Sequence, residues 1–219
     1  GTYQPPTQFA VFPPVIKNLL ILNCLLFLAQ IVPETNNILI YWFGLWPLGS
    51  APIPLGIPLG QFWPWQLVSY AFLHGNFSHL LFNMFALWMF GVQVEKTWGS
   101  RRFAVFYFVC VIGAAVLQII VASSGVGWYP TIGASGGVFG LLLAFGMMFP
   151  DQPIYLYFLF PVKAKWFVIG YGLIELYAGV SGSSSVAHFA HLGGMMFGFI
   201  LIQYWRGRLP WKPEQRMFW

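Results

Sequence analysis

Apolar residues gather into six long runs, separated by stretches that hold most of the charges and the prolines. The runs predict helices at residues 15–32, 77–94, 103–122, 135–149, 166–179 and 186–204. A helix needs about 20 residues to cross a bilayer, so the fourth and fifth runs are short for full spans. The pattern favours an all-α membrane protein, a six-transmembrane-helix bundle.

The stretch between the first two runs has a different character. Residues 33–76 are rich in tryptophan, tyrosine and proline, and aromatic side chains of this kind favour the headgroup zone of a membrane. We expect a long interfacial loop between helices 1 and 2. It could be a simple anchor, or a wall beside a site in the outer leaflet.

Composition supports the membrane interpretation. The chain is 58% hydrophobic and only 7% charged, whereas soluble domains carry about 25% charged residues. So few charges cannot cover a water-exposed surface, so lipid must. We expect one membrane domain at 15–206, a Pro-rich cytoplasmic tail at 1–14 and a cytoplasmic C-terminal tail at 207–219.

The positions of lysine and arginine orient the predicted bundle. Cations occur at the start of the first run, between the second and third, between the fourth and fifth, and after the sixth: Lys17, Lys96, Arg101, Arg102, Lys163, Lys165, Arg206, Arg208, Lys212 and Arg216. With six spans, all lie on one side. The positive-inside rule makes that side cytoplasmic, with both termini there, and we expect a bacterial cytoplasmic (inner) membrane. The net charge of +5 then reflects topology and indicates no nucleic-acid partner.

A glycine-flanked serine opens the fourth run, in the string TIGASGGVFG at 131–140. Ser135 stands at a predicted helix N-terminus, where unpaired N–H groups can stabilise an anion. Gly133 and Gly136 would let another helix backbone approach closely. Alone, the motif equally fits ordinary packing of small residues.

Two histidines enter the sixth run, in AHFAHLGGMMFG at 187–198. Gly194 and Gly198 form a small-residue stripe, three and seven residues after His191. The stripe could bring His191 to Ser135, so we expect His191 rather than His188 to be a base. A structural histidine is the alternative.

The second run begins HGNFSHLLFN, residues 74–83. His79 and Asn83 are spaced i, i+4 and share a helix face, and both can donate hydrogen bonds to an anion. An interhelical hydrogen bond is the plainer alternative. Together with Ser135 and His191, the pair completes the nucleophile, base and oxyanion donors that acyl transfer needs.

Other catalytic classes fit less well. Glu175 is the one acid within a predicted span. It could orient a histidine as in a triad, but it lies mid-span, whereas the other polar groups cluster toward the outer face. We therefore expect a structural hydrogen bond. The single aspartate, Asp151, excludes an aspartyl pair, and the chain lacks the HExxH string of zinc proteases. A transporter would show repeats or broken helices around a midplane site. The sequence shows no convincing repeat, but the broken pattern of residues 36–66 keeps a transporter as a weaker alternative.

The three motifs together resemble the rhomboid family over roughly residues 62–205. GASG at 133–136 is similar to the family's GxSG motif, AHLGG with Gly198 to AHxxGxxxG, and His79 with Asn83 to HxxxN. VEKTWGSRRF at 94–103 is similar to the ExxxG turn after the second span.

The resemblance implies a six-helix bundle around a water-filled cavity open to the outside. It implies an intramembrane serine endopeptidase that cleaves transmembrane protein substrates near the extracytoplasmic end of their helix. It implies a Ser135–His191 dyad without an acid, and no metal or organic cofactor. The oligomeric state stays open.

Two departures from the family pattern stand out. Many members carry Trp-Arg in the first loop, but here Gln66 follows Trp65. Members often carry a tyrosine four residues after the serine, stacked behind the histidine; Phe139 fills that place and lacks the hydroxyl. The alternative function is a catalytically inactive rhomboid-like protein that binds membrane clients, although such relatives typically lack the dyad.

Overall fold

The computed structural model describes residues 12–49, 60–123, 129–156, 159–181, 187–211, 213 and 217. These residues are mostly helical. Of the two predicted tails, residues 1–11, 212, 214–216 and 218–219 lie outside the described residues, as do 124–128 and 182–186 in the predicted outer loops.

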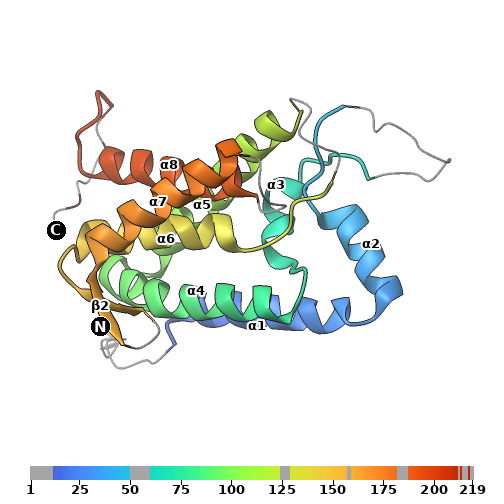
Figure 1. Cartoon of the computed structure of the whole chain (residues 1–219), viewed down its shortest axis with the longest axis horizontal. Coiled ribbons are helices and arrows are strands. Elements are labelled where there is room, and N and C mark those ends of the chain that lie inside the picture. The colour runs from blue at the N-terminus through green and yellow to red at the C-terminus, as the bar shows by residue number, and fades with distance from the viewer. Residues whose placement is uncertain are drawn as a thin grey trace, which may run out of the picture.

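Each predicted apolar run corresponds to a helix. The helices are α1 (Pro14–Gln30), α4 (Phe77–Trp98), α5 (Ser100–Val121), α6 (Ser135–Met148), α7 (Ala164–Ser181) and α8 (His188–Trp205). Figure 1 shows them lying side by side, with α2 and α3 at one end and β2 at the other. By length and composition, α4 and α5 could each cross a membrane, whereas α1 and α6 are apolar but shorter. That all six helices span stays a prediction.

The core is centred on α5, which packs most closely against α8, while α6 lies against both. Phe103, Phe106, Tyr107 and Cys110 of α5 are fully buried. Helix α7 is the most peripheral of the six, with Val168 and Glu175 among only three buried residues along its length. Large apolar side chains on its other faces are exposed, as they are on α1 and α4. Such a surface suits lipid rather than water.

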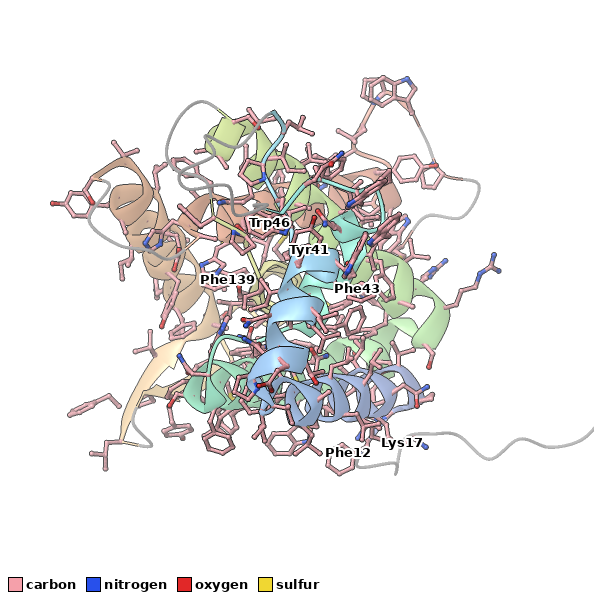
Figure 2. All side chains as sticks on the ribbon, turned by 90° about the vertical axis from the view of Figure 1, so that its right-hand side faces the viewer. Phe12, Lys17, Tyr41, Phe43, Trp46 and Phe139 are labelled. Atoms are coloured by element: carbon pink, nitrogen blue, oxygen red, sulfur yellow. The ribbon has the colours of Figure 1, made fainter. Side chains whose placement is uncertain are left out.

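Much of the segment predicted as a loop between the first two long helices is helical. It contains α2 (Pro33–Phe43), α3 (Gln66–Ser69) and the 3-10 turn η2 (Tyr70–Phe72). Pro33 occupies the first turn of α2 together with Glu34, and both residue types favour a helix start. In Figure 2, which looks onto this end, α2 lies in front with Tyr41 and Phe43 near its C-terminal end.

Gln66 anchors this segment where many rhomboids carry arginine. Its side chain is fully buried. Its Oε1 accepts from the backbone N–H groups of Trp46 (3.3 Å) and Trp63 (3.2 Å). Its Nε2 donates to the carbonyl oxygens of Trp42 (3.2 Å) and Gln61 (3.0 Å). A neutral amide thus supplies two donors and two acceptors, all of them used.

A short β-hairpin joins α6 to α7, which corrects the all-α prediction. Strands β1 (Pro153–Leu156) and β2 (Phe160–Lys163) pair antiparallel. Prolines at 153 and 161 disfavour a helix here, while β-branched and aromatic neighbours favour strands. Beside the hairpin, the Lys165 ammonium donates to Asp151 at 2.9 Å. This hydrogen bond is the main cause that lowers the pKa of the Asp151 carboxyl.

Glu95 ties the start of α1 to the turn between α4 and α5. Its carboxylate accepts from the backbone N–H groups of Val15 (3.0 Å) and Ile16 (2.9 Å) and from the Ser100 hydroxyl (2.6 Å). Gly99 makes the turn with a φ of +79°, a conformation that glycine adopts without strain. The ExxxG string therefore forms a buried structural clamp at the end of the bundle where α1 begins.

Candidate active site

Two long-range attachments fix the loop that precedes Ser135. Leu45 and Thr131 pair as an isolated antiparallel bridge through two 2.9 Å hydrogen bonds. The N–H of Gly133 donates to the carbonyl of Tyr70 at 2.9 Å, and Gly133 has a φ of +130°. A residue with a Cβ would be strained in that conformation. The chain then enters α6 with Ser135 as its first helical residue.

Ser135 and His191 meet across the interface of α6 and α8. The Ser135 Oγ lies 2.7 Å from the His191 Nε2, within hydrogen-bond distance. Glycines permit the close approach: a Cβ placed on Gly194 would overlap the carbonyl oxygen of Gly136 and lie 2.8 Å from its carbonyl carbon. Gly136 in turn faces the Ala114 side chain and leaves no room for a Cβ.

The glycine stripe of α8 does not face one neighbour along its whole length. A Cβ on Gly198 would meet Cys110 Sγ and Phe106 Cζ of α5, each at 3.0 Å. Gly198 therefore packs against α5, which corrects the expectation that it packs against the helix carrying Ser135. Helix α8 lies between α5 and α6, so residues four apart near its middle can face different partners.

The ring of Phe139 stacks on the imidazole of His191. Their centroids are 4.2 Å apart and their planes differ by 5°. Phe139 follows Ser135 by one helical turn, so α6 supplies both the hydroxyl and the ring that flanks the histidine. The stack limits rotation of the imidazole on one face without the tyrosine hydroxyl common in the family.

His79 and Asn83 lie near the start of α4. The Gly75 N–H donates to His79 Nδ1 at 3.3 Å, so this nitrogen is an acceptor and the proton of a neutral ring sits on Nε2. A Cβ on Gly133 would lie 2.9 Å from that Nε2, which places it beside the loop leading to Ser135. One amide hydrogen of Asn83 is donated to the His79 carbonyl at 2.8 Å.

Glu175 reaches the same cluster, contrary to our expectation of a mid-span structural group. Its Oε2 lies 2.9 Å from His191 Nδ1 and 2.6 Å from His188 Nδ1. Helix α7 continues to Ser181, so Glu175 sits in its last two turns, level with the first turn of α8. The resemblance implied a dyad without an acid, but in the structure a carboxylate lies at hydrogen-bond distance from His191. The sequence carried a signal for this contact, because an acid alone in an apolar run is costly and indicates a functional partner.

A cavity of about 740 Å³ opens onto these groups. Ser135, His191, His79 and Asn83 all contribute to its wall. The rest is mostly apolar and comes largely from α4, α6 and α7: Phe82, Phe85, Met89, Val138, Phe139, Leu142, Phe167 and Tyr171 among others. A hydroxyl, two imidazoles and an amide thus share one apolar cavity, the arrangement expected of a site for acyl chemistry.

Comparisons with known proteins identify a family. Residues 61–208 match the model of the rhomboid domain. Rhomboid protein 1, mitochondrial, of Saccharomyces cerevisiae is 32% identical over 165 residues, which cover 69% of this chain and 44% of the relative. Rhomboid protease GluP of Bacillus subtilis is 32% identical over 135 residues, 62% of this chain and 25% of the relative.

RHOMBOID-like protein 4 of Arabidopsis thaliana is also 32% identical, over 137 residues that cover 63% of this chain and 33% of the relative. The chain thus spans less than half of the length of each of these relatives. The family match includes Ser135, His191, His79 and Asn83, and covers α4 to α8. The chain therefore belongs to the rhomboid family and is an integral membrane protein.

Proposed function

We propose that this chain is an intramembrane serine endopeptidase with Ser135 as nucleophile and His191 as base. The observation that carries the proposal is the 2.7 Å contact between Ser135 Oγ and His191 Nε2, inside an apolar cavity at a helix N-terminus. A serine is a weak nucleophile until a neighbouring base takes its proton. No cofactor is needed for this reaction.

The reaction has two balanced steps. Ser135 Oγ attacks the scissile carbonyl as His191 Nε2 takes its proton, and His191 then gives that proton to the leaving amine as the peptide C–N bond breaks. Water attacks the resulting acyl ester, with His191 again as base, which releases the new carboxylate and restores the Ser135 hydroxyl.

The oxyanion of each tetrahedral intermediate needs donors on the side facing α4. The first N–H groups of α6 have no partner within the helix, and Ser135 supplies one of them. His79 Nε2–H is a further donor, because His79 Nδ1 already accepts from Gly75. Asn83 keeps one amide hydrogen beyond the one it donates to the His79 carbonyl.

The walls of the cavity favour a substrate that arrives from the bilayer. Phe82 and Phe85 of α4 line the cavity and are exposed. Opposite them stands α7, which has only three buried residues along its length. A substrate helix that unwinds between α4 and α7 would present its backbone to Ser135. We therefore propose single-span membrane proteins as substrates, cut near the extracytoplasmic end of their helix.

The same proposal includes six spans and an orientation. The described lysines and arginines lie at the end of the bundle opposite Ser135: at the starts of α1, α5 and α7, at the ends of α4 and α8, and at the last residue of β2. This supports a cytoplasmic location for that end, in a bacterial inner membrane. Labelling of a cysteine introduced at position 212 by an impermeant reagent in intact cells would refute the orientation.

The test uses the purified protein in proteoliposomes with a single-span model substrate and a fluorophosphonate probe. We expect the wild type to cleave the substrate and to be labelled, and Ser135→Ala to do neither. His191→Ala should lose at least about 10⁴ in turnover, as when one member of a serine–base unit is removed. Ser78→Ala is the matched control, since this exposed hydroxyl lies at the same end of the bundle.

A catalytically inactive, client-binding rhomboid-like protein is the second candidate. Retention of both Ser135 and His191 at hydrogen-bond distance favours the protease. The two candidates separate in the same experiment, because an inactive relative would bind the substrate helix without cleaving it and would leave Ser135 unlabelled.

A further inference from the structure

Glu175 is the one described acidic side chain that touches the proposed catalytic pair. It is buried, whereas its neighbours on α7, Ile174 and Leu176, point outward and are largely exposed. Its Oε2 lies 2.9 Å from the Nδ1 of His191, and the Nε2 of the same ring contacts Ser135. Helices α7, α8 and α6 thus contribute one member each to a continuous line of hydrogen bonds.

We propose that Glu175 is a positioning residue for His191, so that the site works as a Ser135–His191–Glu175 triad. This inference rests on the proposed protease function and deepens it. An ionised carboxylate can only accept hydrogen bonds, so His191 must donate through Nδ1. That fixes the neutral tautomer with its lone pair on Nε2, the nitrogen that faces Ser135.

The carboxylate has a second role during the reaction. When His191 takes the serine proton, the imidazole becomes positive inside an apolar cavity, where an isolated charge is costly. Glu175 lies at hydrogen-bond distance from that cation and compensates its charge, as the acid of a soluble triad does without itself taking the proton. Only the transition state and the intermediates carry this charge, so the effect belongs in kcat.

His188 completes the environment of the carboxylate. Its Nδ1 lies 2.6 Å from the same Oε2, so Glu175 is held from two sides on one oxygen. The side chain of His188 does not contact Ser135 in any described hydrogen bond, and it belongs to the first turn of α8. It therefore helps to hold Glu175 beside His191 without contacting the nucleophile, so its removal should cost less than removal of the carboxylate.

A purely structural role for Glu175 would have a different signature. A buried carboxylate with two histidine donors could simply join α7 to α8, and its loss would then lower stability without changing turnover. Glu95 is the matched control, because it is also buried and accepts backbone and hydroxyl hydrogen bonds at the far end of the bundle. Glu95→Gln should lower the melting temperature and leave kcat per folded molecule unchanged.

The experiment compares wild type, Glu175→Gln, Glu175→Asp, His188→Ala and Glu95→Gln in proteoliposomes. We expect Glu175→Gln to lower kcat at least about tenfold with KM unchanged. The loss should stay below the roughly 10⁴-fold seen when a soluble triad loses its acid charge, because Phe139 still stacks on His191. Glu175→Asp should recover part of the loss, and His188→Ala should cost less than Glu175→Gln.

A spectroscopic measurement separates positioning from stability. In protein with ¹⁵N-labelled histidine, the wild type should show His191 protonated at Nδ1, and Glu175→Gln should show a mixture of tautomers. Unchanged kcat and an unchanged tautomer in folded Glu175→Gln would overturn the triad while leaving the protease proposal intact. Loss of activity on chelation would also overturn it, since the ligand atoms of Glu175, His188 and His191 lie within 4.8 Å of one another and would then hold a metal ion. An inactive wild type would instead contradict the proposed function.

Discussion

Gly194→Ala is the substitution that should separate folding from catalysis most clearly. Gly194 lies three residues after His191 on α8, against the backbone of Gly136 on α6. The added Cβ would overlap the Gly136 carbonyl oxygen and lie 2.8 Å from its carbonyl carbon and 3.2 Å from its Cα. Backbone atoms cannot rotate away as side chains do, so the two helices must separate.

The size of the separation follows from these distances. Carbon atoms pack at about 3.5–4.0 Å, so relief of the 2.8 Å contact needs a shift of about 1 Å. Applied to His191, the same shift lengthens the 2.7 Å contact with Ser135 beyond hydrogen-bond range. A displacement of about 1 Å in a reacting group can cost about 10²-fold in rate, and overpacking costs about 1–3 kcal/mol of stability.

The assay is turnover of a single-span substrate together with the rate of fluorophosphonate labelling, each normalised to folded protein. Gly170→Ala on α7 is the control, because a Cβ there would meet nothing within 4 Å. We expect about a 10²-fold loss for Gly194→Ala and none for Gly170→Ala. Wild-type turnover in Gly194→Ala, at a lowered melting temperature, would show that the Ser135–His191 geometry does not depend on this helix contact.

Three further outcomes follow from other described contacts. Asn83→Ala should lower turnover about 10²–10³-fold, the usual cost of one oxyanion donor, while probe labelling stays detectable. Full turnover in the His79→Ala, Asn83→Ala double variant would show that neither side chain stabilises the oxyanion. Glu95→Gln should destabilise the protein by about 1–3 kcal/mol, because an amide cannot accept from all three of its donors, and an unchanged melting temperature in detergent would contradict that. Gln66→Leu should destabilise by at least as much, since it strands two N–H groups and two carbonyls, and thermal unfolding again measures it.

The sequence predicted what depends on hydropathy and on local spacing. The apolar runs placed α1 and α4 to α8 to within a few residues, because a bilayer constrains composition along each span. The position of Gly194 predicted that His191, rather than His188, would lie beside Ser135, and the two side chains are in hydrogen-bond contact. The role of His191 as base stays a prediction, as do the oxyanion roles of His79 and Asn83.

The sequence failed where long-range geometry decided the outcome. The segment of α2 was predicted as a loop, because its aromatic and proline residues indicated a membrane interface. Pro33 was not recognised as the first residue of a helix. The partners of Gln66 lie up to 24 residues away, and no spacing rule reveals them. The sequence favoured a structural role for Glu175, because its depth was judged from a predicted helix at 166–179. Only the extent of α7 to Ser181 brings it level with His191.

Helix α7 combines two properties that make access and chemistry interdependent. It forms one side of the cavity and has little buried surface, and it carries the carboxylate that hydrogen-bonds to His191. A displacement of α7 away from α8 would also draw Glu175 away from the imidazole of His191. Under the proposed triad, the site would be least reactive while α7 is displaced, and the bond to His191 would form again only when α7 returns. A membrane helix in brief contact with the site would then meet a serine without an oriented base, so discrimination among membrane proteins would depend on residence time as well as on sequence.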